Sequence, residues 1–325
     1  MRHYVVTGGA GFIGSSLIKQ LLAADNDVRI TAVENFDPFY SRQLKELNIS
    51  GFARDPRFTL QVADLAVETP KSLAEKITVP VDVIVHLAAK AGVRPSILDP
   101  LAYQRANVLG LQNMLDFAVQ ADCSQFVFAS SSSVYGVNDH FPWKEDERLM
   151  PVSPYAMTKL AGEMLGHVYN RLYKTRFIAL RFFTVYGPGQ RPDLAIHKFT
   201  KRILEGRPLP VFGDGSTSRD YTYIDDTVQG IVAAMSYRES GFEIINLGNN
   251  YAVPLKQLIE ALEKTIGRKA SIEQLPEQPG DVPKTYADIS KARKLLGYSP
   301  STSLEVGLEN FYQWFSQHRQ LLMAD

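Results

Sequence analysis

The chain has 325 residues, of which 45% are hydrophobic and 22% are charged, a composition typical of a folded globular protein with a full core. Its 35 lysine and arginine residues balance 35 aspartate and glutamate residues, which argues against a nucleic-acid-binding protein, since such a protein carries a net basic field. The length suits a larger domain joined to a smaller lobe.

Short apolar runs alternate with amphipathic stretches through the first half of the chain. The runs predict strands at Tyr4–Thr7, Ile30–Glu34, Phe58–Ala63, Val83–Ala88, Phe126–Ser130 and Phe177–Phe182, and the stretches predict helices at Phe12–Ala24, Ala102–Ala121 and Tyr155–Tyr173. Repetition of strand and helix predicts an α/β fold with a doubly wound parallel sheet. Such a sheet binds ligands at the carboxyl ends of its strands.

The alternation ends after about Tyr186, where proline and glycine become frequent. We expect residues 1–185 to form the sheet domain, with residues 222–248 returning to it through Thr222–Met235 and Ile244–Leu247. Residues 186–221 and 249–325 are then expected to form a smaller, interleaved C-terminal lobe that binds the substrate.

The turn after the first predicted strand is rich in glycine. Gly8, Gly11 and Gly14 surround Phe12 and Ile13, which open the following helix. Glycine is needed because the turn is tight, because a side chain would collide with a bound pyrophosphate, and because the helix must pack closely on the strand. The free amide groups of the helix N-terminus then face the phosphates. In this strand–turn–helix context, the spacing predicts a Rossmann-type dinucleotide site.

The end of the second predicted strand indicates which dinucleotide binds. Glu34 stands where a carboxylate accepts hydrogen bonds from the ribose hydroxyls of NAD and repels the extra phosphate of NADP, so we predict NAD. Further expected cofactor contacts are Asn35, Asp64, Leu65, Leu87, Ala88, Ala89, Lys90, Asn107 and Ser130. Asparagine is a poor helix former, so Asn107 either holds a backbone kink or cofactor-facing loop, or is a tolerated polar residue.

Tyr155 and Lys159 lie four residues apart on a predicted helix, so both side chains project from one face. A nearby ammonium and a positively charged nicotinamide would lower the pKa of the phenol from its usual value near 10. Tyr155 would then accept a proton from a substrate hydroxyl. Ser131, in the serine run Ser130–Ser133 at a strand end, is expected to relay or steady that proton. The alternatives are a surface lysine beside a half-buried tyrosine, and a serine-rich capping turn.

These motifs resemble the extended short-chain dehydrogenase/reductase family, whose members carry Thr-Gly-x-x-Gly-x-x-Gly and Tyr-x-x-x-Lys, and the resemblance runs over essentially the whole chain. Within that family the chain is most similar to the NAD-dependent nucleotide-sugar epimerases, in particular the UDP-glucuronate 4-epimerases, over residues 35–45, 86–94 and 181–193. It departs from them at Lys90, where they usually have glutamine, and at Gly189-Gln190, where they usually have Trp-Gly.

The serine run separates activities within that family. Related dehydratases and decarboxylases have an acid two residues before the tyrosine of their Val-Tyr-Gly motif, and this chain has Ser133 there. Elimination of water needs an acid and a base near C5 and C6, for which serine is a poor substitute, so the resemblance implies an epimerase. Thr184 resembles uronate-specific members and, with Ser132 and Ser133, could hydrogen-bond a C6 carboxylate.

The resemblance implies further contacts to a nucleotide sugar, and these are Arg94, Arg191, Val211, Phe212, Arg219 and Asp281. Arg191 and Arg219 are the phosphate candidates, because guanidinium binds phosphate in a bidentate manner. Arg94 is a candidate partner of the carboxylate. The edge strand expected at Pro210–Gly213 would lie along a uracil, and Asp281 would accept from the ribose or orient an arginine. Each of these residues has an alternative reading as a turn residue or surface pair.

The expected function is reversible C4 epimerisation of UDP-glucuronate to UDP-galacturonate through a 4-keto intermediate, with tightly bound NAD and catalytic residues Tyr155, Lys159 and Ser131. The alternatives are a 4-epimerase of a neutral or N-acetylated UDP-hexose and a non-catalytic protein that binds NAD or a nucleotide sugar. The family implies a homodimer through helices like Ala102–Ala121 and Tyr155–Tyr173. We expect no metal site.

Several segments that would indicate another location are missing from the sequence. No apolar run approaches the roughly 20 residues that span a bilayer, and no cleavable signal precedes the first apolar run. Cys123 is the only cysteine, so no intramolecular disulfide can form, and we expect it to be a core residue. We therefore expect a cytoplasmic protein with no membrane partner.

Overall fold

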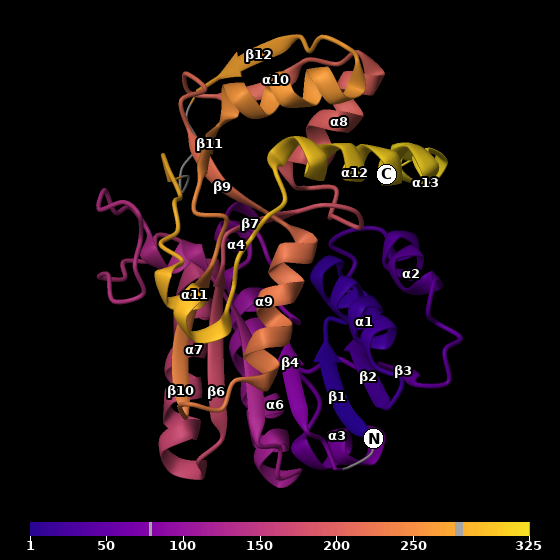
Figure 1. Ribbon diagram of the computed structural model, residues 1–325, viewed down its shortest axis with the longest axis vertical. Helices are drawn as coiled ribbons and strands as arrows, with labels where there is room; N and C mark the ends of the chain where they lie inside the picture. The colour runs from indigo at the N-terminus through magenta and orange to yellow at the C-terminus, as the bar shows by residue number, and fades with distance from the viewer. Residues whose placement is uncertain (78–79, 277–281, 325) are drawn as a thin grey trace.

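A seven-stranded parallel sheet forms the centre of the molecule in the computed structural model, which describes residues 1–77, 80–276 and 282–324 (Figure 1). Its strands are β1 (Arg2–Thr7), β2 (Val28–Glu34), β3 (Phe58–Val62), β4 (Val83–His86), β5 (Gln125–Ser131), β6 (Arg176–Phe182) and β10 (Phe242–Leu247). They lie in the order β10-β6-β5-β4-β1-β2-β3, and every neighbouring pair is parallel. The predicted doubly wound α/β fold is confirmed, and its order reverses between β1 and β4, where such sheets bind ligands.

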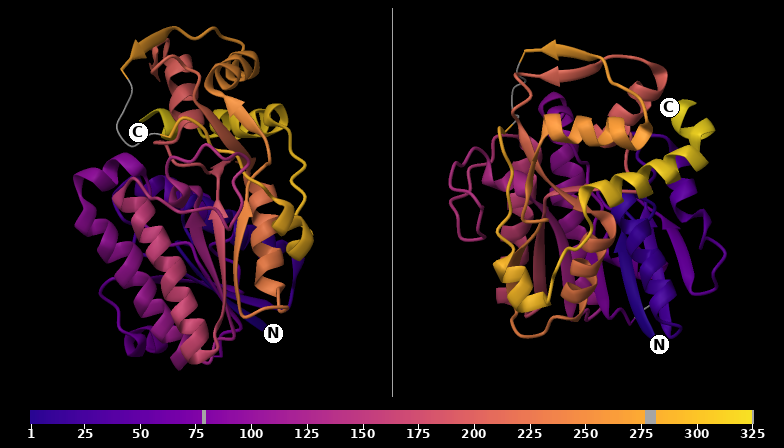
Figure 2. Two further views of the ribbon diagram at one scale, coloured as in Figure 1. Left: turned by 90° about the vertical axis from the view of Figure 1, so that its left-hand side faces the viewer. Right: turned by 45° about the horizontal axis from the view of Figure 1, so that its top comes forward.

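Helices cover both faces of this sheet (Figure 2). One face carries α1 (Phe12–Ala24) and α9 (Ile224–Ser236), with α2 (Arg42–Ser50) beside α1 and α11 (Ser290–Leu296) beside α9. The other face carries α3 (Pro70–Lys76), α6 (Gly110–Gln120) and α7 (Pro154–Tyr173), and α4 (Val93–Leu98) and α5 (Pro100–Gln104) pack on α7. Because both faces are covered, the inner strands β1, β4, β5 and β6 are buried along nearly their whole length. No helix within the described residues is long and apolar enough to cross a membrane.

The first turn of α7 is set by local sequence. The Ser153 hydroxyl accepts a hydrogen bond from the backbone N–H of Ala156, and Pro154 occupies the first turn, where its missing N–H costs nothing. The helix ends at Tyr173, and the following residue, Lys174, adopts the left-handed conformation with φ 60°. These signals fix the start of α7 immediately before Tyr155.

The single helix expected at Ala102–Ala121 is instead interrupted. A π-helical turn, Arg105–Leu109, separates α5 from α6. The buried Asn107 side chain lies in this turn and bonds to the backbone of Lys90 and to the Thr158 hydroxyl. A π-turn is a common insertion at functional sites, and here it brings an amide into the protein interior.

The remaining elements lie beyond the carboxyl ends of the sheet strands (Figure 1). They are the sheet β11 (Ala252–Pro254), β9 (Ser218–Tyr223) and β7 (Thr184–Tyr186), the pair β8 (Leu209–Phe212) and β12 (Ile272–Leu275), and helices α8 (Ala195–Glu205), α10 (Leu255–Ile266), α12 (Leu304–Gln317) and α13 (Arg319–Ala324). We propose that residues 186–221 and 249–325 form this smaller lobe, apart from α11, which packs on β10 and α9 of the main sheet domain. A continuous cluster of buried apolar side chains joins it to the α1 and α9 face of the sheet.

Candidate functional site

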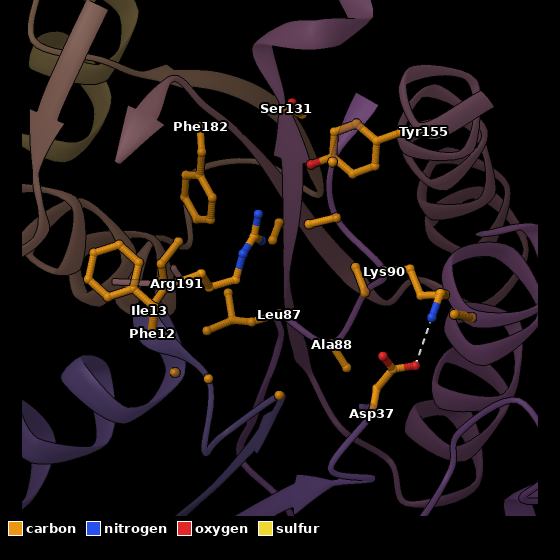
Figure 3. Close-up of a pocket in the computed structure, with 18 of the residues that line it drawn as sticks. Phe12, Ile13, Asp37, Leu87, Ala88, Lys90, Ser131, Tyr155, Phe182 and Arg191 are labelled. Carbon is orange, nitrogen blue, oxygen red and sulfur yellow. Dashed lines mark hydrogen bonds and ion pairs between the residues drawn. The ribbon is translucent and has the colours of Figure 1, made fainter. Parts of the chain in front are cut away.

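A cavity of about 490 Å³ opens at the carboxyl ends of the central strands (Figure 3). The predicted site residues that line it are Gly8, Gly11, Phe12, Ile13, Gly14, Glu34, Asn35, Asp64, Leu65, Leu87, Ala88, Ala89, Lys90, Ser130, Ser131, Ser132, Ser133, Tyr155, Lys159, Thr184 and Arg191. Arg94, Asn107, Val211, Phe212 and Arg219 do not line it, and Asp281 lies outside the described residues. The cavity also takes in residues that the sequence did not indicate, among them Asp37, Tyr40, Lys45 and Asp193.

The glycine turn at the base of the cavity has the geometry that a pyrophosphate requires. Gly8 has φ 68°, a conformation that a residue with a side chain rarely adopts. A Cβ atom on Gly14 would stand only 2.3 Å from the Gly8 carbonyl oxygen, so the turn closes only with glycine there. Gly11 caps α1 without a side-chain hydrogen bond, which leaves helix N–H groups for an anionic ligand. These features fit NAD.

Glu34, at the end of β2, is held in place by two donors to one of its oxygens. Its Oε1 atom accepts from the Phe36 backbone N–H at 3.0 Å and from Lys45 Nζ at 3.2 Å. The side chains of Glu34 and Lys45 are each only 6% exposed, so the ammonium neutralises a carboxylate that would otherwise be costly to bury. The arrangement leaves Oε2 for the ribose hydroxyls of NAD. The sequence missed Lys45 because nothing in its local pattern distinguishes it from a surface lysine.

Tyr155, Lys159 and Ser131 come together beside the sheet. Tyr155 and Lys159 occupy successive turns of α7, and Ser131 is the last residue of β5. The Ser131 hydroxyl acts on the Tyr155 phenol and favours a lower pKa for it, and Figure 3 shows both side chains at the same end of the cavity. Lys159 Nζ donates to the Ala129 carbonyl oxygen at 2.7 Å and lies 5.9 Å from the centre of the Tyr155 ring.

Burial controls the pKa values of these two groups. It lowers the pKa of Lys159 to about 7, because the ammonium is removed from water. It raises the pKa of Tyr155, while the Ser131 hydrogen bond and the charge of Arg191 act in the opposite direction. The sequence predicted a Tyr155 pKa lowered by Lys159 and a bound nicotinamide together. Among the protein's own groups, burial outweighs the effects that lower this pKa.

A buried ion pair lies one helical turn beyond Lys159. Glu163 and Arg181 are 0% and 1% exposed and form two parallel bonds, Nε to Oε1 at 2.8 Å and Nη2 to Oε2 at 2.9 Å. The Ser130 hydroxyl donates to Glu163 Oε1 at 2.5 Å. Lys159 and Glu163 therefore fix successive turns of α7 to Ala129 and Ser130 of β5, which holds the start of the serine run against the helix.

The serine run leaves β5 through a 3₁₀ turn, Ser132–Tyr135. Ser131 caps this turn: its Oγ accepts from the Ser133 backbone N–H at 3.2 Å and donates to Ser133 Oγ at 3.1 Å. Thr184 enters the cavity from the start of β7. Four hydroxyl groups therefore face one end of the cavity, where they can donate to a carboxylate or accept from a sugar.

The arginines predicted to contact substrate take different positions. Arg191 reaches into the cavity (Figure 3) and pairs with Asp193 through Nε and Nη2 at 2.9 and 2.8 Å. Arg94 lies over the Phe212 ring, 4.6 Å from its centre. Arg219 donates to the Ser218 and Pro283 carbonyl oxygens. Only Arg191 is therefore in the cavity.

The Gly189-Gln190 departure makes a tight turn. Gly189 has φ 83°, and the buried Gln190 side chain accepts from the Gly187 N–H at 3.3 Å. The Gln190 carbonyl oxygen lies 3.1 Å from His197 Nδ1, which anchors the turn to α8 and sets the direction in which Arg191 leaves it. Within the residues that the structure describes, no group of three or more His, Cys, Asp or Glu side chains could hold a metal ion.

Comparison with known proteins is consistent with this geometry. The family model described as "NAD dependent epimerase/dehydratase family" matches residues 4–248. A UDP-glucuronate 4-epimerase of Thermodesulfobacterium geofontis is 38% identical, with 100% of this chain and 99% of that protein covered, and a probable UDP-glucuronate 4-epimerase of Rhizobium meliloti is 38% identical, with 97% of each covered. The crystal structure of UDP-glucuronic acid 4-epimerase from Bacillus cereus, in complex with UDP-glucuronic acid and NAD, matches with a TM-score of 0.91 and 39% identity over 97% of this chain and 99% of that chain.

Proposed function

The chain belongs to the NAD-dependent epimerase/dehydratase family, and we propose that it is an enzyme that reversibly inverts C4 of UDP-glucuronate to give UDP-galacturonate. The observation that carries the proposal is the meeting of Ser131, Tyr155 and Lys159 in the cavity that also holds the glycine turn and Glu34. Full-length similarity to UDP-glucuronate 4-epimerases supports the choice of sugar.

Tyr155 is the group that moves the proton of the C4 hydroxyl. Its phenol lies between Ser131 and the face of α7 that carries Lys159, so a sugar hydroxyl placed beside it can pass a proton to the phenolate. Ser131, which lies with Tyr155 at this end of the cavity, can receive or steady that proton. When bound, NAD supplies the acceptor for the hydrogen that leaves C4 and the donor for its return to the opposite face.

Lys159 is proposed to fix α7 against β5 and to act on Tyr155 and the cofactor. Its ammonium is fixed by the Ala129 carbonyl oxygen and stands close enough to the Tyr155 ring to favour the phenolate electrostatically. We also propose that Lys159 donates hydrogen bonds to the ribose hydroxyls on the nicotinamide side of the cofactor. Glu34 accepts from the ribose hydroxyls on the adenine side, and Gly11 to Ile13 present backbone N–H groups to the pyrophosphate.

The hydroxyl groups of Ser132, Ser133 and Thr184 are proposed to bind the C6 carboxylate. The 4-keto intermediate of a uronate is a β-keto acid, so the site must keep that carboxylate out of the geometry that loses CO2. Hydroxyl donors achieve this by fixing its plane without supplying an acid. Arg191 is the proposed phosphate ligand, because its guanidinium is the one predicted substrate arginine that enters the cavity.

The function is tested by incubating purified protein with UDP-glucuronate without added cofactor and resolving the products by NMR. We expect UDP-galacturonate, no net NADH and no loss of CO2. An unchanged UDP-glucuronate pool, even with added NAD+, together with turnover of UDP-glucose or an N-acetylated UDP-hexose, would replace the proposal by the neutral-hexose alternative. No turnover of any nucleotide sugar would favour a binding protein.

We further propose a cytoplasmic homodimer. On α7, Met164, Val168 and Leu172 form one exposed apolar stripe, and Leu98 and Leu101 lie exposed on the adjoining helices. Leu98 and Leu172 are 87% and 65% exposed, and exposed apolar side chains gathered on neighbouring helices are typical of an interface. Light scattering should give twice the 36.3 kDa of one chain, and Leu172→Glu should give the monomer; a monomeric wild-type protein would overturn the proposal.

A further inference from the structure

Lys90, one of the residues at which the chain departs from its resemblance, forms an ion pair at one side of the cofactor cavity. Its Nζ atom lies 2.8 Å from Asp37 Oδ2, and Figure 3 shows the two side chains reaching toward each other. Both residues line the cavity, and their side chains are 27% and 28% exposed. The pair is therefore neither buried nor freely solvated.

Lys90 and Asp37 are each also held by hydrogen bonds to residues other than their ion-pair partner. The Lys90 backbone N–H donates to Asn107 Oδ1 at 2.7 Å, and its carbonyl oxygen accepts from Asn107 Nδ2 at 3.0 Å. Asp37 Oδ1 accepts from the Phe39 backbone N–H, and the Asp37 carbonyl oxygen accepts from Lys45 Nζ. Because both backbones are fixed, forming the pair costs less conformational entropy than forming a surface pair between mobile chains.

The strand order determines what the pair crosses. Lys90 follows β4 and Asp37 follows β2, and β1 lies between these strands in the sheet. A bond between the two loops must therefore pass over the carboxyl end of β1, which carries the glycine turn that starts at Gly8. The turn, Lys90 and Asp37 line the same cavity, so a dinucleotide whose pyrophosphate lay on that turn would have the ion pair beside it.

We propose that Lys90 and Asp37 form a clasp that retains NAD in this protein, so that the cofactor leaves only when the pair opens. The inference rests on the NAD-bound state of the proposed function. An enzyme that regenerates its cofactor in each turnover gains from slow release, because every departure leaves it inactive until NAD returns. The role belongs to the two side chains as a pair, and neither is placed in contact with the reacting atoms.

The test measures NAD release from purified holoenzyme without any sugar nucleotide, by following free NAD in an ultrafiltrate over time. The variants are Lys90→Gln, which introduces the residue usual in the similar enzymes, Asp37→Asn and the double variant. Lys291→Gln is the matched control, because it removes the Lys291–Glu243 pair, which has comparable exposure and lies outside the cavity. The experiment does not measure epimerase activity. The clasp can therefore be contradicted while the proposed function is supported, and the proposed function can be contradicted while the clasp is supported.

Each single variant should release NAD about fivefold faster than the wild-type protein, and the double variant should be no faster than either single one. Raising NaCl from about 0.01 M to about 1 M, which shortens the screening length from about 30 Å to about 3 Å, should speed release from the wild-type protein and from Lys291→Gln more than from the other variants. Release from Asp37→Asn at the wild-type rate would overturn the clasp. Faster release from Lys90→Gln alone would also overturn it, and would assign Lys90 to direct contact with NAD.

Discussion

Ser131 and Tyr155 lie together at one end of the cavity although they come from different elements, the end of β5 and the first turn of α7. Lys159, one turn along the helix, ties α7 to β5 through the Ala129 carbonyl oxygen. The position of the phenol is thus set by the packing of the helix on the strand, and we expect the site to keep its shape when one of its groups is altered.

Replacing Tyr155 by phenylalanine should lower kcat by about 10²–10⁴-fold, because it removes the group that moves the C4 proton. Circular dichroism and retained NAD should be unchanged, since the hydroxyl contributes one hydrogen bond. Tyr298→Phe is the control: its buried hydroxyl donates to the Gly248 carbonyl oxygen outside the cavity, so it should affect stability and leave kcat near the wild-type value. Comparable losses of kcat in both variants would contradict the role of Tyr155.

Replacing Thr184 by valine should impair turnover of UDP-glucuronate specifically. The hydroxyl is proposed to donate to the C6 carboxylate, and a hydrogen bond to a charged group contributes about 1.5–3 kcal/mol. We expect kcat/KM for UDP-glucuronate to fall about 10- to 100-fold, while kcat/KM for UDP-glucose, which has no carboxylate, changes much less. An equal loss of kcat/KM for both sugars would show that Thr184 shapes the cavity and does not recognise the C6 carboxylate.

Replacing Glu34 by serine should weaken the preference for NAD over NADP. The change removes the carboxylate that accepts from the ribose and exposes the Lys45 ammonium, now 3.2 Å from Glu34 Oε1, to the extra phosphate of NADP. Calorimetric titration of cofactor-depleted protein should show NAD binding weaker by about tenfold or more and NADP binding tighter. Glu46→Ser is the control, because Glu46 is exposed on α2, the helix that carries Lys45, and it should leave the preference for NAD unchanged. A preference that is unaffected in both variants would argue against Glu34 as the selecting group.

His86 should make the protein sensitive to acid. Burial, together with the charge of Lys159, lowers the pKa of His86 from 6.5 to about 3. In the unfolded chain His86 is protonated below about pH 6.5, whereas in the folded chain it stays neutral down to about pH 3. Acid therefore favours unfolding over that range. The free energy of unfolding should fall by up to about 1.4 kcal/mol per pH unit more steeply in the wild-type protein than in His86→Asn. Equal slopes in urea denaturation between pH 6.5 and 4 would contradict this.

Much of the fold could be predicted because its signals are local. The alternation of apolar runs and amphipathic stretches identified six of the seven strands of the main sheet and indicated the return of Ile244–Leu247, and the glycine spacing placed the turn after β1. For the interruption at Arg105–Leu109, the sequence offered a backbone kink at Asn107 as one of two interpretations. The choice between them depends on the bonds of Asn107 to Lys90 in another loop, which only the fold shows. The predicted strand Val83–Ala88 was two residues too long: β4 ends at His86, and the next residues leave the sheet to line the cavity.

The residues of the site also divide into those that the sequence could place and those that it could not. Tyr155 and Lys159 could be placed together because four-residue spacing on a helix puts them on one face. Asp37 and Glu163 were missed because their partners, Lys90 and Arg181, come from other elements and meet them only in the folded chain. The interval between two such residues carries no periodic signal, so pairs of this kind emerge only from the three-dimensional arrangement.

The central claim is that C4 is oxidised and reduced within one site, and the most direct test is the fate of deuterium placed at C4 of UDP-glucuronate. The account predicts that UDP-galacturonate formed in ordinary water keeps the deuterium at C4, because the hydrogen that leaves the carbon returns to it without exchange. Product that carries solvent hydrogen at C4 would contradict the account, since it would require a route in which that hydrogen leaves as a proton.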